Sequence, residues 1–234
     1  IDYEELADVL YDLAKQTVSY LETYQTTEEI KKILKYESPK IANFIFSQLL
    51  GHMADQEQQF EVTVTQSFVP ILKETTATAV ASDYVKDFKQ PLDTKSEIRK
   101  FVFNGFSKCL YDQQKFDSDK ERRLAVIIDK EAVKWFKPVK GQFQIFYKDG
   151  TEEPLYVPDF AVELKDKILM IEVKREDEIN DLVVQSKKKA AQSWCSAATE
   201  HAHKTGQLPW VYLLIPGNEI ADNYSLAYFI GKYS

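Results

Sequence analysis

Two short apolar runs, separated by a polar triplet, constrain the fold of this chain more than any other stretch. They lie between Tyr156 and Lys174 and read YVPDFAVEL and ILMIEVK, with the triplet at 165–167. β-Branched and bulky apolar residues bounded by turn signals are typical of strands, so the stretch predicts two strands and a tight connection. Because strand side chains alternate between faces, Glu172 and Lys174 are predicted on one face of an otherwise apolar strand.

The same alternation places Leu169, Ile171 and Val173 on the opposite face. Asp159 follows a proline early in the first strand, a position from which its carboxylate could face the same point as Glu172. A buried strand rarely ends in ionisable groups unless they are paired or bind a metal. The residues alone therefore leave two interpretations open, an ion pair beside an aspartate that merely starts a strand, or a metal site.

The spacing of these residues resembles the motif of the PD-(D/E)XK nucleases. Pro158-Asp159 resembles its first half, and Glu172-Val173-Lys174 its second. Over about residues 95–216 the chain is similar to the C-terminal endonuclease domain of type III restriction enzyme Res subunits and related helicase–nucleases. The flanking residues that carry this likeness are Phe116-Asp117-Ser118, Glu121, Trp135-x-Lys137-Pro138, Lys187 to Ala191 and Trp194-Cys195.

The resemblance implies a Mg²⁺-dependent DNA endonuclease, a metal-dependent deoxyribonuclease in which Mn²⁺ substitutes for Mg²⁺. Its catalytic residues would be Asp159, Glu172, Lys174 and Glu121, and its metal ligands Asp159, Glu172, the Val173 carbonyl and Glu121. Phosphodiester hydrolysis needs a nucleophilic water, neutralised phosphate charge and help for the leaving oxygen, and a carboxylate-held metal supplies all three. Mg²⁺ prefers oxygen ligands and keeps several waters, so few carboxylates suffice. Lys174 would orient the water or stabilise charge on the phosphate.

Glu121 has a second interpretation. Ser118-x-x-Glu121 is a capping box, in which the glutamate satisfies the first turn of its own helix. The sequence leaves open whether Glu121 caps the helix or reaches the metal.

Three residues early in a predicted long helix are candidates for DNA contact, namely Gln185, Lys187 and Lys189. A solvated helix face is an equally good interpretation of each lysine. Expected partners are DNA, a helicase-like motor domain of the same longer chain, and a modification or specificity subunit, with no membrane. The alternative function is an inactive nuclease-like domain that binds DNA or serves as a scaffold.

Charge is distributed unevenly along the chain. The formal net charge is −7, and residues 1–60 hold 11 acidic side chains against 5 lysines, so residues 61–234 sum to about −1. We expect the acidic segment to dock protein rather than nucleic acid. Two cysteines are too few for a disulfide framework and fit a reducing, cytoplasmic location.

The remaining pattern predicts a mixed α/β sheet flanked by helices, the PD-(D/E)XK restriction-endonuclease-like architecture, after an N-terminal helical segment. The boundary is expected near residue 90, giving a mainly helical connector over 1–90 and an endonuclease domain over 91–234. Helices are expected at 3–23, 26–36, from Ser38-Pro39, from Thr94 through Val102, from 118 and from 179. Strands are expected at 60–68, 109–111, 143–147 with a hairpin at Asp149-Gly150, and 210–215, before a final short helix or strand.

Overall fold

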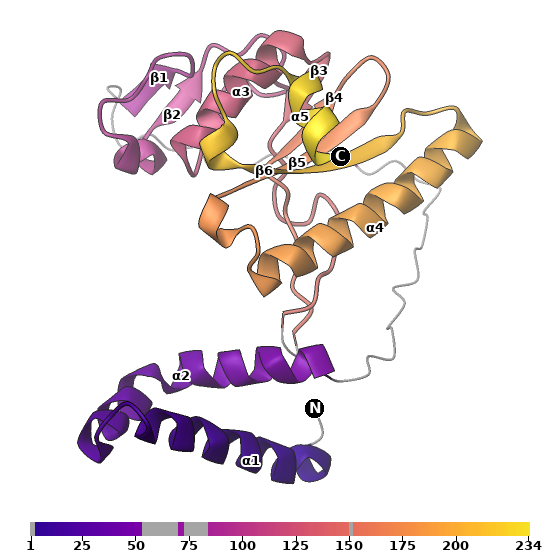
Figure 1. Cartoon of the computed structure of the whole chain (residues 1–234). Coiled ribbons are helices and arrows are strands. Elements are labelled where there is room, and N and C mark those ends of the chain that lie inside the picture. The colour runs from indigo at the N-terminus through magenta and orange to yellow at the C-terminus, as the bar shows by residue number, and fades with distance from the viewer. Residues whose placement is uncertain (1–2, 53–69, 73–83, 150–151) are drawn as a thin grey trace. The chain divides into compact units, whose positions relative to one another are not determined.

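The computed structural model of the chain describes residues 3–52, 70–72, 84–149 and 152–234 (Figure 1). The chain divides into two compact units. One comprises Ile1–Glu61 with Gly150–Glu152, and the other Val62–Asp149 with Glu153–Ser234. Each unit is described by itself below.

The first unit is a pair of helices, α1 (Tyr3–Glu22) and α2 (Thr27–His52). The capping box predicted at the start of α2 is present, since the Thr26 N–H donates to Glu29 Oε2 at 2.9 Å. The prediction that a new helix begins at Ser38-Pro39 is wrong, because α2 continues through Pro39. A proline removes one intrahelical hydrogen bond, and a helix of 26 residues retains enough others to run past it.

The second unit is built on a four-stranded sheet in the order β3-β4-β5-β6. β3 pairs antiparallel with β4, β4 antiparallel with β5, and β5 parallel with β6. The strands are β3 (Lys134–Phe136), β4 (Phe160–Glu163), β5 (Ile168–Lys174) and β6 (Trp210–Pro216). The two central strands and their tight connection are as predicted, with the Leu164 N–H donating to the Lys167 carbonyl at 2.8 Å. A parallel neighbour requires a crossover, which α4 (Leu182–Thr205) supplies.

Helices cover both faces of this sheet (Figure 1). Leu169, Ile171 and Val173 lie in the core that includes α3 (Asp119–Glu131) and α5 (Leu226–Tyr233). Met170 lies in the other core, against α4. The predicted alternation along β5 is therefore confirmed, and the general mixed α/β class with it.

The long helix begins later than predicted. It begins at Leu182, after the short 3₁₀ turn η3 (Glu176–Glu178), rather than at 179. Its buried residues are Val184, Ala191, Cys195 and Ala202, whereas Ala190 and Trp194 are only partly buried.

Short strands were missed. β1 (Val85–Asp87) pairs in parallel with β2 (Val102–Asn104), where we predicted a helix through Val102. That helix is only the 3₁₀ segment η2 (Lys95–Lys100), and the Thr94 side chain makes no capping hydrogen bond.

Two other predicted strands are reduced to single bridges. Cys109 bridges Trp135, and Phe146 bridges Leu155, with the Tyr156 N–H donating to the Ile145 carbonyl at 2.7 Å. The predicted strand at 60–68 and part of the predicted Asp149-Gly150 turn lie outside the described residues.

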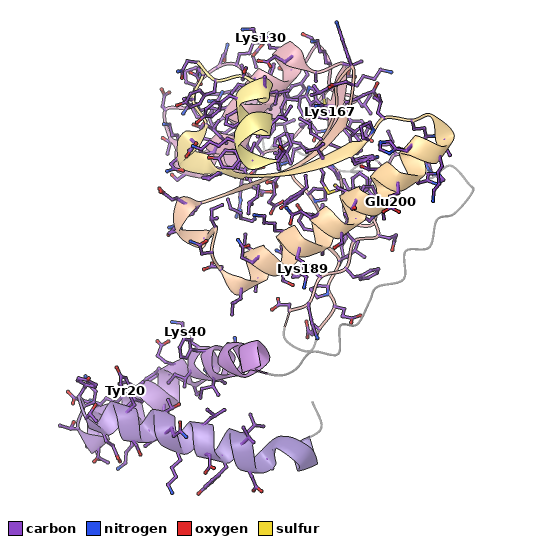
Figure 2. The ribbon with its side chains drawn as sticks, turned by 45° about the vertical axis from the view of Figure 1, so that its right-hand side comes forward. Tyr20, Lys40, Lys130, Lys167, Lys189 and Glu200 are labelled. Carbon is purple, nitrogen blue, oxygen red and sulfur yellow. The ribbon has the colours of Figure 1, made fainter. Side chains whose placement is uncertain are left out.

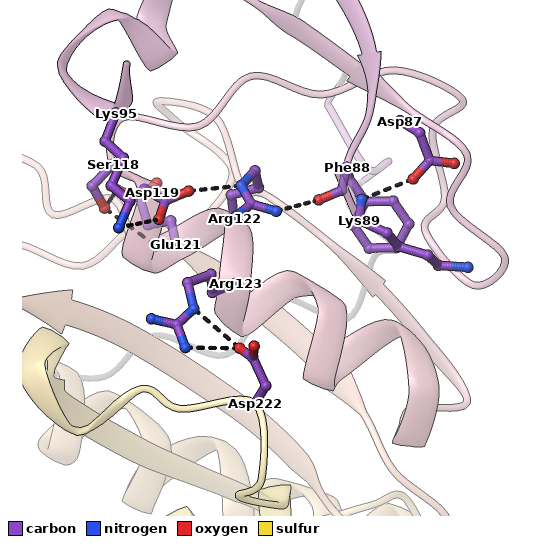
Figure 3. A network of polar contacts seen from close by, with 10 residues as sticks. All are labelled: Asp87, Phe88, Lys89, Lys95, Ser118, Asp119, Glu121, Arg122, Arg123 and Asp222. Atoms are coloured by element: carbon purple, nitrogen blue, oxygen red, sulfur yellow. Dashed lines mark hydrogen bonds and ion pairs between the residues drawn. The ribbon is translucent and has the colours of Figure 1, made fainter. Parts of the chain in front are cut away.

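Within the second unit, Arg122 of α3 contacts the segment before residue 90 (Figure 3). Its guanidinium donates to Asp119 Oδ1 at 2.8 Å and to the Phe88 carbonyl at 2.7 Å. Phe88 itself is fully buried in the core of that unit. The second unit therefore includes residues that we had placed before a boundary near residue 90. Arg123 binds Asp222 at 2.8 Å and ties α3 to the loop before α5.

Within the described ranges, no helix combines the length and apolar character needed to cross a membrane.

Candidate functional site

Asp159, Glu172 and Lys174 meet at the same end of the paired strands β4 and β5. Asp159 directly precedes β4, and its N–H donates to the Ile171 carbonyl at 3.0 Å. Its carboxylate Oδ2 accepts a hydrogen bond from the Val173 N–H at 2.8 Å. The antiparallel register thus carries the aspartate to the end of β5 where the other two residues lie, as the sequence predicted.

Glu172 is buried and held at both oxygens. Oε1 lies 2.8 Å from Lys174 Nζ, and Oε2 accepts a hydrogen bond from the Tyr156 hydroxyl at 3.0 Å. The ion pair that the residue pattern allowed is therefore present in the protein. The Lys174 side chain keeps 26% of its surface exposed, so it is partly open to solvent.

Asp159 has a strongly raised pKa. Burial raises its pKa well above the usual range, the charge of Glu172 raises it further, and Lys137 opposes both. The residue is nevertheless partly accessible at the surface. For Lys174, burial lowers the pKa, but the charges of Glu172 and Asp159 outweigh it and leave the pKa raised. A protonated lysine thus stands beside two crowded carboxylates.

Glu121 lies in the first turn of α3, where Ser118 is the N-cap (Figure 3). Its N–H donates to Ser118 Oγ at 3.2 Å, and its Oε1 accepts from the same hydroxyl at 2.9 Å. Its other oxygen, Oε2, lies 2.6 Å from Lys137 Nζ and accepts from the Asp117 N–H at 3.2 Å. The capping interpretation is confirmed, and its negative charge also acts on Asp159.

Lys137 is the site residue that sequence reasoning passed over. It follows β3 and was noted only for its family likeness, without a role. Burial lowers its pKa, but Glu121 and Asp159 outweigh that effect and leave the pKa raised. The signal that could have revealed it is its position two residues after Trp135, which is buried.

The oxygen donors suit a hard cation. Mg²⁺ takes one or two carboxylates and keeps several waters, and Asp159 and Glu172 supply two. The Val173 N–H points toward Asp159, and the carbonyl of a strand residue points to the same neighbour as its N–H. The crowding that raises the pKa of Asp159 is relieved by a bound cation. In the described part of the chain, however, no three His, Cys, Asp or Glu side chains form a metal-binding group, so Glu121 does not complete a triad.

The three α4 residues predicted to contact DNA lie in different environments. Gln185 donates to the Ile179 carbonyl at 2.6 Å and so closes the turn before the helix. Lys187 Nζ lies 4.9 Å from the ring centre of Tyr147. Lys189 is exposed on the helix surface (Figure 2). DNA contact by Gln185, Lys187 and Lys189 stays a prediction.

No family model, curated protein or solved structure matches this chain. The function is accordingly inferred from the residues and their geometry.

Proposed function

We propose that the second unit is a Mg²⁺-dependent DNA endonuclease with a PD-(D/E)XK fold. The observation that carries the proposal is the meeting of Asp159, Glu172 and Lys174 at one end of β4 and β5, where Val173 N–H binds the aspartate. The motif resemblance supports it, as does the mixed sheet with helices on both faces. A structural ion pair alone leaves unexplained why a second carboxylate is placed beside it.

Each residue has a role in this chemistry. Asp159, Glu172 and the Val173 carbonyl would hold the ion, and bound Mg²⁺ would supply Lewis-acid stabilisation of phosphate charge and a lower pKa for the attacking water. The water gives up one proton to solvent as its oxygen bonds to phosphorus, one ester P–O bond breaks, and the leaving oxygen takes a proton from solvent. Lys174 donates from Nζ to a non-bridging phosphate oxygen or to the water, and the partial exposure of its side chain supports this role.

The proposal extends to the partners and location expected from the sequence. DNA would reach the site past Lys187, which lies on the Tyr147 ring. A helicase-like motor domain of the same longer chain and a modification or specificity subunit would supply sequence recognition. The expected location is cytoplasmic.

A second candidate is an inactive nuclease-like domain that binds DNA or acts as a scaffold. The observation in its favour is that Glu172 and Glu121 are each already paired with a lysine. Because lysines already neutralise these carboxylates, the site needs no metal ion to be stable.

The test is cleavage of covalently closed circular DNA by the full chain with Mg²⁺, Mn²⁺ or EDTA. We expect the parent to cut the circle with either metal, and Lys174→Met to lower the rate by about 100- to 1,000-fold. The matched control is Lys165→Met, an exposed lysine in the connection between β4 and β5, which should cut like the parent. A parent that leaves the circle intact but degrades linear DNA would be an exonuclease.

Thermal melting separates the two candidates without a substrate. Mg²⁺ or Mn²⁺ should raise the melting temperature of the parent and of Lys174→Met by mass action, but not that of Asp159→Ala. In EDTA, Asp159→Ala should be at least as stable as the parent, because the repulsion from Glu172 is gone. An inactive parent whose melting ignores both metals would support the scaffold and reject the nuclease.

A further inference from the structure

We propose that Tyr156 limits Glu172 to a single metal-binding oxygen and thereby makes the site select Mg²⁺ or Mn²⁺ over Ca²⁺. The inference rests on the proposed nuclease function and deepens it by naming the residue that sets its metal preference. Tyr156 touches neither DNA nor the metal ion in our assignment. It acts through Glu172 and is therefore a positioning residue.

The Tyr156 hydroxyl is held firmly where it meets Glu172. The residue is 2% exposed and lies in the core against α4, together with Ile145 and Met170. Its backbone N–H donates to the Ile145 carbonyl at 2.7 Å, which anchors the segment just before β4. A close-packed aromatic side chain has little freedom to move, so its hydroxyl is a rigid partner for the carboxylate.

The two oxygens of Glu172 have different surroundings. Oε2 accepts a hydrogen bond from the Tyr156 hydroxyl at 3.0 Å, and both residues are buried. Oε1 lies 2.8 Å from Lys174 Nζ, and the lysine side chain is partly open to solvent. An ion that arrives from solvent therefore meets Oε1, whereas Oε2 is bonded to an enclosed tyrosine. A cation at Oε1 would replace the lysine contact and leave the tyrosine bond in place.

This difference between the oxygens favours a small ion. Mg²⁺ keeps several waters and needs only one or two carboxylates, each of which can bind through one oxygen. Ca²⁺ is larger, takes about 6–8 oxygen ligands and can recruit both oxygens of a carboxylate. The hydrogen-bonding partner of a ligating carboxylate fixes its orientation and tunes the metal. With Oε2 held by Tyr156, Glu172 has one oxygen left for a cation, which suffices for Mg²⁺ and leaves Ca²⁺ short of ligands.

The experiment compares the Mn²⁺ and Ca²⁺ affinities of the full chain by calorimetric titration without DNA. Mn²⁺ stands in for Mg²⁺, since both suit carboxylate and water ligands. We expect the parent to bind Mn²⁺ more tightly than Ca²⁺. Tyr156→Phe keeps the ring but frees Oε2, and should lower the preference for Mn²⁺ by about 10-fold. The matched control is Tyr147→Phe, a tyrosine of the same core, which should keep the preference of the parent.

Infrared difference spectroscopy of the parent with and without metal tests the same feature independently of the variant. A carboxylate that binds a cation through one oxygen shows a wider separation between its antisymmetric and symmetric stretches than one that binds through both. Labelling glutamate with ¹³C at the side-chain carboxyl separates its bands from those of Asp159, and Glu172→Gln should remove the metal-sensitive ones. We expect one-oxygen binding by Glu172 in the parent with either ion, and two-oxygen binding of Ca²⁺ in Tyr156→Phe.

The outcomes separate this inference from the nuclease proposal. Binding through both oxygens of Glu172 in the parent would overturn the inference even if Tyr156→Phe failed to fold. An unchanged Mn²⁺ preference in a folded Tyr156→Phe would also overturn it, because a tyrosine that only fills the core would lower stability without changing metal preference. In both cases a parent that cuts DNA with Mg²⁺ keeps the nuclease proposal intact. A parent that binds no Mn²⁺ and cuts no DNA would instead reject the nuclease, and this inference with it.

Discussion

Each glutamate of the site has its own lysine, and the two pairings differ in how the sequence reveals them. Glu172 and Lys174 are two residues apart on one strand, so the period of β5 alone places them together. Lys137 and Glu121 meet across 16 residues, through a three-residue strand and a helix cap. The strand period therefore predicted the Glu172–Lys174 pair, whereas the Glu121–Lys137 pair is visible only in the folded structure.

The thiols provide a test at the same scale, because burial raises the pKa of Cys195 to about 12 and that of Cys109 to about 11. A raised pKa means that the reactive thiolate forms only at higher pH. At pH 8 about one Cys195 in ten thousand and about one Cys109 in a thousand would be ionised, against about one in ten for a pKa near 9.

We therefore expect both native cysteines to react with iodoacetamide far more slowly than in guanidinium, Cys195 the slower of the two. Their rates should rise about tenfold per pH unit from pH 8 toward each pKa. Peptide mass spectrometry at several pH values measures both rates. Native rates equal to the denatured ones would show that the thiols are not shielded as described.

At the scale of elements, the sequence was informative where an element is long or capped locally. The sequence predicted α1 from its helical period, α3 from its Ser118 cap, and β4, β5 and β6 from their apolar runs. β1, β2 and β3 have three residues each, too few for any period, and their partners fix them through hydrogen bonds to distant chain. Thr94 shows the opposite error, a capping pattern without the capping bond.

Pro39 in α2 supports a prediction about that helix. Pro39→Ala restores a backbone donor and removes the clash of the ring with the preceding turn, at an exposed position. We expect α2 to gain about 1–3 kcal/mol, seen as slower hydrogen exchange of its amides in the full chain. Glu29→Ala, which removes the bond to Thr26, should shift exchange the other way, toward faster exchange. Unchanged exchange in Pro39→Ala would mean that the proline does not limit this helix.

At the scale of the whole molecule, charge separates the chain into two parts. Residues 1–60 hold most of the net charge of −7, and the remainder is close to neutral. DNA binding depends on cationic contacts to phosphate, which an acidic segment opposes.

We expect deletion of residues 1–60 to leave DNA affinity equal or higher at fixed salt. Fluorescence anisotropy with a labelled duplex measures the affinity, and near-ultraviolet circular dichroism checks that the second unit stays folded. A large loss of affinity in a folded deletion variant would place the acidic segment in the DNA site.

The parallel pairing of β5 with β6 has a consequence for how this protein is made. The site residues run from Glu121 to Lys174, whereas β6 begins at Trp210, beyond the whole of α4. A growing chain emerges N-terminal end first, so all the site residues leave the ribosome before β6, the edge strand that completes the sheet. Until β6 arrives, β5 is an open edge, the kind of backbone that adds strands from other chains. Whether β5 avoids pairing with other chains during synthesis thus depends on how quickly the last third of the unit emerges and β6 docks against it.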